Sequence, residues 1–238
     1  MAEWTERAEL LFKKRGLENL KNAHVMVVGL GGVGSFAAEF LARAGVGTMT
    51  IVDGDIVDIT NINRQLPALH STVGQPKVTI VGDRLMDINP ELKLIRIQEF
   101  LSPERAYELV TPQYDYVLDC IDSITPKLNL LMSARRQKVK IISNMGAGGK
   151  YEASKVKVAD ISKTEYCPLA KTVRKRLRKE GISKGVKVVF STEEPDQTSL
   201  KMTDGTNFKK SFFGTNSWMP ALFGLHSAET VVKYLIKK

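Results

Sequence analysis

One glycine-rich stretch, residues 25–53, constrains the fold of this chain more than any other feature. It opens with an apolar run at residues 25–28, which is typical of a buried parallel strand. Three glycines follow at G-x-G-x-x-G spacing, namely Gly29, Gly31 and Gly34. In a nucleotide-binding turn, the first glycine permits the tight turn, the second lets backbone approach a phosphate, and the third lets the helix pack close to the strand.

The remainder of this stretch supplies the other parts of a nucleotide-binding unit. Residues 35–43 favour a helix and residues 48–52 a second strand, and Asp53 ends that strand 24 residues after Gly29. An acid in this position hydrogen-bonds ribose hydroxyls in nucleotide-binding folds. The combination predicts a Rossmann-like, doubly wound α/β fold with a nucleotide site, and it favours this over a glycine-tolerant turn that binds nothing.

Composition narrows the class of protein. With 238 residues, 43% of them hydrophobic, the chain can form one sizeable core, and its formal charge of +9 favours an anionic partner. Two cysteines, Cys120 and Cys167, cannot form a four-ligand zinc site and fit a reducing compartment. We see neither a signal peptide nor about 18 uninterrupted apolar residues of a membrane span. We therefore expect a cytoplasmic protein and leave peripheral membrane association open.

We expect one domain over residues 1–238. Within it we distinguish a helical arm at residues 1–20, a nucleotide-binding core at 21–150, and a basic segment at 163–187. The arm carries Arg7, which sequence alone does not distinguish from a solvated charge.

The loop after the second strand is too long and polar for a tight connection, so it favours a functional loop over a plain surface loop. Its side-chain donors are Asn61, Asn63, Arg64 and Gln65. The planar guanidinium of Arg64 is suited to clamping a phosphate. Lys77 then opens a helix, where a cation opposes the helix dipole unless an anionic ligand lies nearby.

Asp122 follows a buried strand that begins at residue 116. It lies at the carboxyl end of that strand, which is the usual ligand edge of an open α/β sheet. Its carboxylate is suited to Mg²⁺ or to a phosphate-bound metal. An N-cap for the following helix explains Asp122 equally well, and the two roles are compatible.

The basic segment holds nine Lys and Arg residues against two acids. Residues 168–181 have a helical pattern in which Leu169, Val173 and Leu177 form the inward stripe. On the opposite side we expect the cations Lys171, Arg174, Lys175 and Arg178. This face favours a phosphate backbone over a merely solvated surface. A membrane-surface helix fits less well, because the apolar stripe is narrow and has no aromatic residue.

Several motifs occur in one order: G-L-G-G-V-G-S, I-V-D, T-N-I-N-R-Q, V-G-Q-P-K and D-C-I-D. Together they resemble the ubiquitin-activating E1-like superfamily, which includes the ThiF and MoeB adenylating enzymes, and the resemblance covers nearly the whole chain. It implies that ATP and Mg²⁺ are cofactors, leaves a monovalent cation open, and implies transfer of AMP to a carboxylate with release of pyrophosphate.

The resemblance also assigns roles to individual positions. It implies that Gly31 and Gly32 approach the phosphates, that Asp53 holds the ribose and that Asp122 serves the metal. The residues implied to hold the phosphates are Asn61, Arg64, Gln65 and Lys77. Arg7 falls where the family has an arginine that reaches into the partner subunit's ATP site, which implies a homodimer. Arg7, Arg64, Lys77 and Mg²⁺ would then stabilise an anionic transition state.

The second half of the chain indicates the subfamily. It lacks the C-x-x-C pairs usual in MoeB-type and ThiF-type enzymes, and it contains G-A-G-G, C-P-L-A-K-T-V-R-K-R-L-R-K, V-F-S-T-E and G-T-N-S-W-M-P-A-L-F-G. These motifs are similar to the tRNA threonylcarbamoyladenosine dehydratase (TcdA, CsdL) subfamily. That resemblance implies ATP-dependent cyclisation of threonylcarbamoyladenosine at tRNA position 37 to a hydantoin. It further implies tRNA on the basic helix and a cysteine desulfurase system as a partner.

The chain departs from the subfamily pattern at three positions. Trp4 and Thr5 replace the R-F pair of the arm, and Cys167 replaces an aspartate before P-L-A. We expect Cys167 to be a packing or surface thiol without a catalytic role.

Three alternative functions remain. An adenylyltransferase for a ubiquitin-like sulfur carrier is disfavoured by the basic helix and the missing zinc cysteines. An NAD-dependent dehydrogenase is disfavoured by the Asn61–Gln65 donors and Lys77, which suit a triphosphate. A non-catalytic tRNA-binding module would bind tRNA without consuming ATP.

Overall fold

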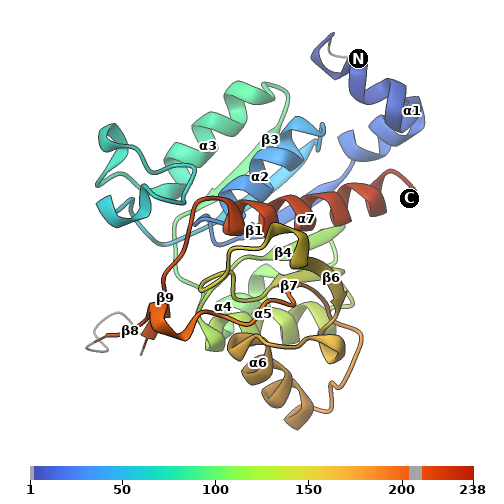
Figure 1. Ribbon diagram of the computed structural model, residues 1–238. Helices are drawn as coiled ribbons and strands as arrows, with labels where there is room; N and C mark the ends of the chain where they lie inside the picture. Colours follow the sequence, from blue (N-terminus) through green and yellow to red (C-terminus); the bar gives the residue numbers. More distant parts are fainter. Residues whose placement is uncertain (1–2, 204–210) are drawn as a thin grey trace.

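Seven strands form a central sheet in the order β3-β2-β1-β4-β5-β7-β6 (Figure 1). The computed structural model describes residues 3–203 and 211–238. The strands are β1 (His24–Val28), β2 (Thr48–Val52), β3 (Lys93–Ile97), β4 (Tyr116–Asp119), β5 (Ile141–Asn144), β6 (Val156–Asp160) and β7 (Lys187–Ser191). All neighbouring strands pair in parallel except β6, which is antiparallel to β7. This is the predicted doubly wound α/β architecture, with one antiparallel edge strand.

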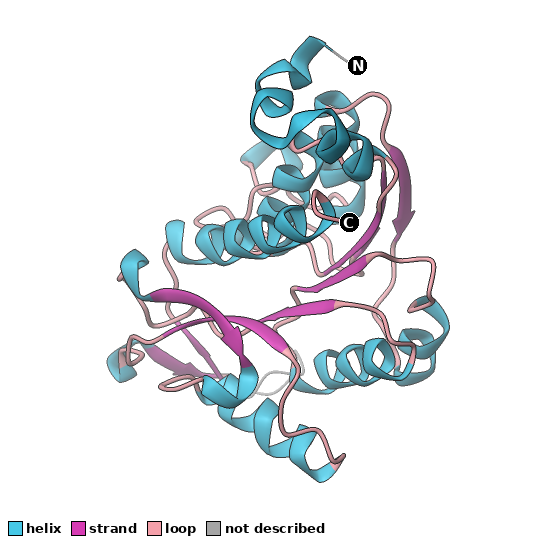
Figure 2. Cartoon of the chain, turned by 90° about the vertical axis from the view of Figure 1, so that its right-hand side faces the viewer, coloured by secondary structure: helices cyan, strands magenta, loops and turns pink. Residues whose placement is uncertain are grey.

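Helices cover both faces of the sheet (Figures 1 and 2). They are α1 (Glu6–Lys21), α2 (Gly34–Arg43), α3 (Lys77–Ile88), α4 (Pro103–Leu109), α5 (Ile124–Arg136), α6 (Pro168–Lys179) and α7 (Trp218–Leu235). Successive strand residues point to opposite faces, so β1 buries Val25 and Val27 on the side of α1, α2, α3 and α7. Met26 and Val28 face α4 and α5 on the other side.

The basic helix α6 belongs to the second of these layers. It buries Ala170, Val173 and Leu177 against α5 and β7, as the inward stripe predicts. Leu169 lies at the margin of this cluster and is half-buried. The apolar side of α6 is therefore satisfied within the chain, and its charged side faces outward.

Two smaller features complete the fold. A short hairpin pairs β8 (Leu200–Met202) with β9 (Ser211–Phe213). The arm begins with a turn of 3₁₀ helix at Glu3–Thr5, and α1 is broken at Lys13, where φ is 63° and ψ is 163°. Within residues 3–203 and 211–238, every helix is too short or too polar to span a bilayer.

Candidate nucleotide and RNA site

The glycine turn lies where the strand order reverses, between the carboxyl ends of β1 and β4. Gly29 has a φ of +88°, and a Cβ there would lie 2.9 Å from the carbonyl oxygen of Cys120 in the turn after β4. A Cβ on Gly34 would lie 1.7 Å from the carbonyl oxygen of Gly29. No side chain fits at that distance, so α2 begins close to β1 only because residue 34 is glycine. In an open α/β sheet this position, at the carboxyl ends of the strands, is where ligands usually bind, and we refer to it as the crevice.

Asp53, at the end of β2, stabilises the glycine turn through hydrogen bonds to the backbone. Its Oδ2 accepts the backbone N–H of Leu30 at 2.6 Å, and its Oδ1 accepts the N–H of Asp55 at 2.7 Å. Burial raises the pKa of the Asp53 carboxyl, and the positive charge of Lys77 opposes that shift. The carboxylate therefore shapes the turn in this structure, while its role toward a ribose stays a prediction.

The loop after β2 lies directly on the glycine turn. Cβ atoms built on Gly31 and Gly32 would lie 3.6 Å from Nε2 of Gln65 and 3.1 Å from the carbonyl oxygen of Arg64. A turn of 3₁₀ helix at Ile59–Asn61 creates this arrangement. The backbone N–H groups of Arg64 and Gln65 both donate to the carbonyl of Asn61, at 3.1 and 2.9 Å.

Asn61 is buried, and its side chain stabilises the loop. Its Oδ1 accepts the N–H of Asp58 at 3.2 Å, and Asp58 in turn accepts the N–H of Thr60 at 2.8 Å. This is a capping box, which orders the loop before any ligand is present. Sequence reasoning assigned Asn61 to the phosphates, and that role stays a prediction.

Arg64 and Gln65 place polar side-chain groups beside the glycine turn. The guanidinium of Arg64 is half-buried, and its Nη1 donates to the carbonyl of Thr60 and to Oδ1 of Asn63, at 2.9 and 2.8 Å. Burial lowers the pKa of Arg64, and the carboxylate of Asp122 opposes this shift. Among the described residues Oε1 of Gln65 is buried without a hydrogen-bond partner. A half-buried cation and an unsatisfied acceptor fit a ligand with both anionic and hydroxyl or amino groups, as a nucleotide has.

Lys77 has a partner within the protein. It is buried at the start of α3, and its Nζ lies 2.9 Å from Oδ2 of Asp55. The sequence suggested that an anionic ligand would account for a lysine at this helix start. The carboxylate of Asp55 already supplies an anion there, so the placement of Lys77 does not by itself require a ligand.

Asp122 is exposed just beyond β4, at the predicted ligand edge. The N-cap of α5 is Ser123, so the alternative interpretation of Asp122 as that N-cap is wrong. Across the described ranges, His, Cys, Asp and Glu side chains form no group of three or more that could hold a metal ion. Mg²⁺ commonly binds through one or two carboxylates together with substrate phosphates, and Asp122 fits that mode.

A buried ion pair beneath Asp122 was missed by sequence reasoning. The Nζ of Lys127 lies 2.7 Å from Oδ2 of Asp119, and both side chains are fully buried. The same Nζ donates to the carbonyl of Asn144 at 2.9 Å, and the Nδ2 of Asn144 donates to the carbonyl of Asp119 at 3.1 Å. Oδ1 of Asp119 accepts the N–H of Ile121 at 3.0 Å and so shapes the turn that leads to Asp122. A lysine on the apolar side of an amphipathic helix was the available signal.

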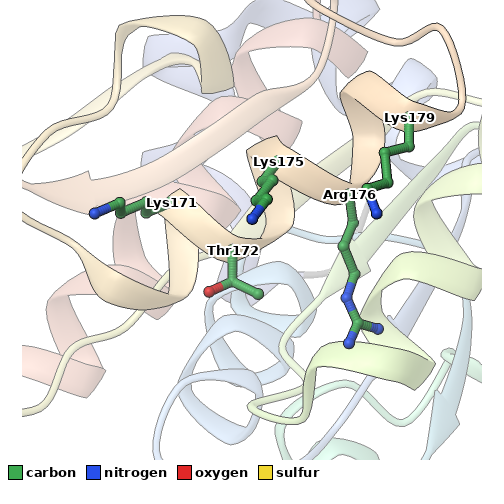
Figure 3. A pocket seen from close by; sticks show the side chains of 5 residues that line it. All are labelled: Lys171, Thr172, Lys175, Arg176 and Lys179. Carbon is green, nitrogen blue, oxygen red and sulfur yellow. The ribbon is translucent and has the colours of Figure 1, made fainter.

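The outer face of α6 forms a shallow cationic hollow (Figure 3). It is lined by Lys171, Thr172, Lys175, Arg176 and Lys179. Of the predicted RNA-facing set, Lys171 and Lys175 line it, whereas Arg176 and Lys179 were not predicted. Arg174 does not project away from the core as expected, because its Nη1 donates to the carbonyl of Thr164 at 2.8 Å and also to its hydroxyl. Arg178 is exposed.

Neighbouring segments connect the loop after β2 with the start of α6. Nδ2 of Asn63 donates to the carbonyl of Thr215 at 2.9 Å, and a Cβ on Gly148 would lie 3.1 Å from Oγ1 of Thr215. Further along the same loop, a Cβ on Gly146 would lie 3.5 Å from Sγ of Cys167. Cys167 is buried and caps α6, since its Sγ accepts the N–H of Ala170 at 3.4 Å. This confirms the expectation of a packing thiol.

The exposed Arg7 lies on the arm, at the opposite end of α7 from the crevice. At one end of α7, a Cβ on Gly32 would lie 3.0 Å from Cβ of Pro220. At the other end, a Cβ on Gly16 of α1 would lie 3.3 Å from Cβ of Ile236. The structure therefore gathers Arg64, Asp122 and the glycine turn, and it leaves Arg7 apart from them.

The fold and crevice define a nucleotide-binding protein of the doubly wound α/β class. The chain belongs to the ThiF family, whose model matches residues 6–238. It is 46% identical to the tRNA threonylcarbamoyladenosine dehydratase of Bacillus subtilis, over 97% of this chain and 94% of that protein. It is 36% identical to the Escherichia coli protein of the same name, over 96% of this chain and 91% of that protein.

A solved structure extends this likeness to three dimensions. The E. coli dehydratase TcdA in complex with ATP superposes with a TM-score of 0.88 at 34% identity, covering 100% of this chain and 96% of that chain. The E. coli molybdopterin-synthase adenylyltransferase is 35% identical, but over 60% of this chain. The resemblance to the dehydratase subfamily, which rested on motifs in the second half, is therefore confirmed.

Proposed function

We propose that this protein is an ATP-dependent tRNA threonylcarbamoyladenosine dehydratase. The observation that supports this most strongly is full-length likeness, at 46% identity, to a protein of that name. The likeness extends over nearly the whole of both chains, whereas the match to the E. coli molybdopterin-synthase adenylyltransferase covers 60% of this one. Adenylation of a sulfur carrier is accordingly the second candidate.

The proposed reaction activates a carboxylate and then closes a ring. A carboxylate is a poor electrophile, and attack of one of its oxygens on the α-phosphorus of ATP transfers AMP to that oxygen while pyrophosphate departs. The carbamoyl nitrogen of the same nucleoside then attacks the carbonyl carbon and loses its proton, and the oxygen leaves with AMP. The nucleoside loses one water in total, and no side chain is required as a covalent nucleophile.

The residues of the crevice would hold and polarise the phosphates. The backbone at Gly31 and Gly32 carries no side chain that would keep a phosphate at a distance. Arg64 lies against Gly32 with a half-buried guanidinium, where its charge is worth more than in water. Lys77, which pairs with Asp55 in this structure, would supply a second cation for the phosphates. Asp122 would hold Mg²⁺ together with the phosphates.

Several further assignments belong to this proposal. The protein would act as a homodimer in which Arg7 of each arm enters the ATP site of the other subunit. The tRNA would lie along α6, a cysteine desulfurase system would be a partner, and the protein would act in the cytoplasm. The position of Arg7 at the far end of α7 from its own crevice supports a role in a partner's site.

The decisive test is nucleoside mass spectrometry. Transfer RNA that carries threonylcarbamoyladenosine is incubated with the protein, ATP and Mg²⁺, and we expect ATP-dependent loss of one water from that nucleoside. Arg64→Ala should abolish both this loss and AMP release. Arg105→Ala is the matched control, since Arg105 of α4 pairs with Glu108 on the same helix and with Glu99 in the preceding loop. An unchanged nucleoside with ATP still bound would favour the sulfur-carrier reaction.

A further inference from the structure

Trp218 is an exposed aromatic residue near the glycine turn, and it has no role in the proposed reaction. Trp218 opens α7 and is 47% exposed. Two residues later, Pro220 lies against Gly32, where a Cβ on the glycine would come within 3.0 Å of the proline Cβ. Trp218 is therefore two residues from a direct contact with the glycine turn, where the activated carboxylate must be formed.

The indole is also held in one orientation. Its Nε1 donates to the carbonyl of Tyr151 at 3.0 Å. The backbone around it is fixed as well, because Oδ1 of Asn216 accepts the N–H of Met219 at 2.9 Å and its Nδ2 donates to the carbonyl of Lys150 at 2.7 Å. A rigid aromatic ring loses little conformational freedom when a second ring stacks on it.

The charges nearby favour an anionic occupant over a protein surface. Arg64 and Pro220 both lie against Gly32, and the loop that carries Gly148 and Gly146 runs from Thr215 to Cys167 at the start of the basic helix α6. Single-stranded RNA combines a phosphate backbone with unstacked bases, and proteins hold such bases on aromatic side chains. Trp218 and α6 offer these two kinds of contact.

We propose that a nucleobase of the RNA substrate stacks on the indole of Trp218 and so positions the reacting nucleoside at the glycine turn. This inference rests on the proposed function, since it requires an RNA loop at the crevice. It goes beyond that function by naming a positioning residue that recognises a base face, whereas α6 recognises phosphates.

Kinetics on modified tRNA provide the first test. Trp218→Leu should raise KM for tRNA about 5- to 150-fold, the range expected for loss of one base–aromatic stack, and should change kcat little. Trp218→Phe should restore most of the affinity, because it retains an aromatic face. The slope of log affinity against log salt should stay at the wild-type value in Trp218→Leu, because no phosphate contact is lost. A wild-type KM in Trp218→Leu would overturn the proposal.

Fluorescence tests the same idea without altering Trp218. The chain contains two tryptophans, so Trp4→Phe leaves Trp218 as the sole indole. We expect an anticodon stem-loop RNA that carries the modified nucleoside to quench this emission, and double-stranded RNA of equal length to leave it unchanged. If quenching increases with protein concentration in the absence of RNA, the indole contacts a second copy of the chain. That result would overturn the proposal. If wild-type protein fails to dehydrate the nucleoside, the proposed function fails and this inference with it; if it succeeds without quenching, this inference alone fails.

Discussion

The glycine turn and the cationic face of α6 are two surfaces suited to anions, and they are built in opposite ways. At the turn, backbone atoms approach so closely that a Cβ on Gly34 would lie 1.7 Å from the carbonyl oxygen of Gly29. On α6, the groups are the ends of long side chains on an exposed helical face (Figure 3). The first surface depends on shape and the second on the number of charges.

This difference predicts how each surface responds to change. A surface defined by backbone fit has few tolerated substitutions, because a displacement of about 1 Å can reduce catalysis by about 100-fold. A surface defined by flexible charges loses affinity in small increments, which salt screens. Substitutions in the two regions should therefore differ in size and in salt dependence.

Gly34→Ala should have the largest effect on ligand binding. The added methyl group overlaps the carbonyl of Gly29, so the turn or the start of α2 must move, and we expect ATP affinity to fall about 100-fold or more. Isothermal titration calorimetry with ATP measures this. Gly45→Ala is the matched control: Gly45 has a φ of +90° with nothing within 4 Å of the added Cβ. It should cost about 1–2 kcal/mol of stability and leave ATP affinity unchanged. If both variants bind ATP with equal affinity, close backbone packing at the glycine turn does not determine ATP binding.

Lys127→Met tests the buried support beneath the turn. It leaves the carboxylate of Asp119 buried without its cation, so we expect a loss of about 3–5 kcal/mol in the free energy of unfolding. Chemical denaturation followed by circular dichroism measures it. Lys155→Met removes an exposed pair with Glu152 and should change stability by less than about 1 kcal/mol. A small effect of Lys127→Met would show that Asp119 becomes protonated or hydrated at little cost.

The difference between backbone shape and side-chain charge also explains which features could be predicted from the sequence. Strand patterns and glycine spacing predicted the sheet and the turn, because both follow from local backbone geometry in one continuous stretch. Charge alone predicted that α6 has a cationic face, but it could not distinguish Arg174, which bonds Thr164, from Arg176, which lines the hollow. Lys127 was missed for a related reason: its partner Asp119 lies on another element, and only the tertiary fold buries the pair.

Removing charges from the hollow should produce a moderate effect that depends on salt. The double variant Lys171→Gln and Lys175→Gln keeps polar side chains, each one atom shorter than lysine, and removes two positive charges. Each lost phosphate contact should reduce the slope of log affinity against log salt by about 0.7, the value for single strands. Filter binding of tRNA across a salt series measures this slope. A slope equal to that of the wild type would show that RNA does not contact this face.

Arg174→Gln should have the smallest effect on RNA binding, although Arg174 lies on the same helix. Its guanidinium bonds the carbonyl and hydroxyl of Thr164, so the lost contacts are internal. We expect a loss of about 1–3 kcal/mol in the free energy of unfolding, because the Thr164 carbonyl loses a charge-assisted bond. The salt slope for tRNA should stay at the wild-type value. A reduced slope without loss of stability would place Arg174 among the phosphate contacts after all, and would mean that RNA draws its side chain away from Thr164.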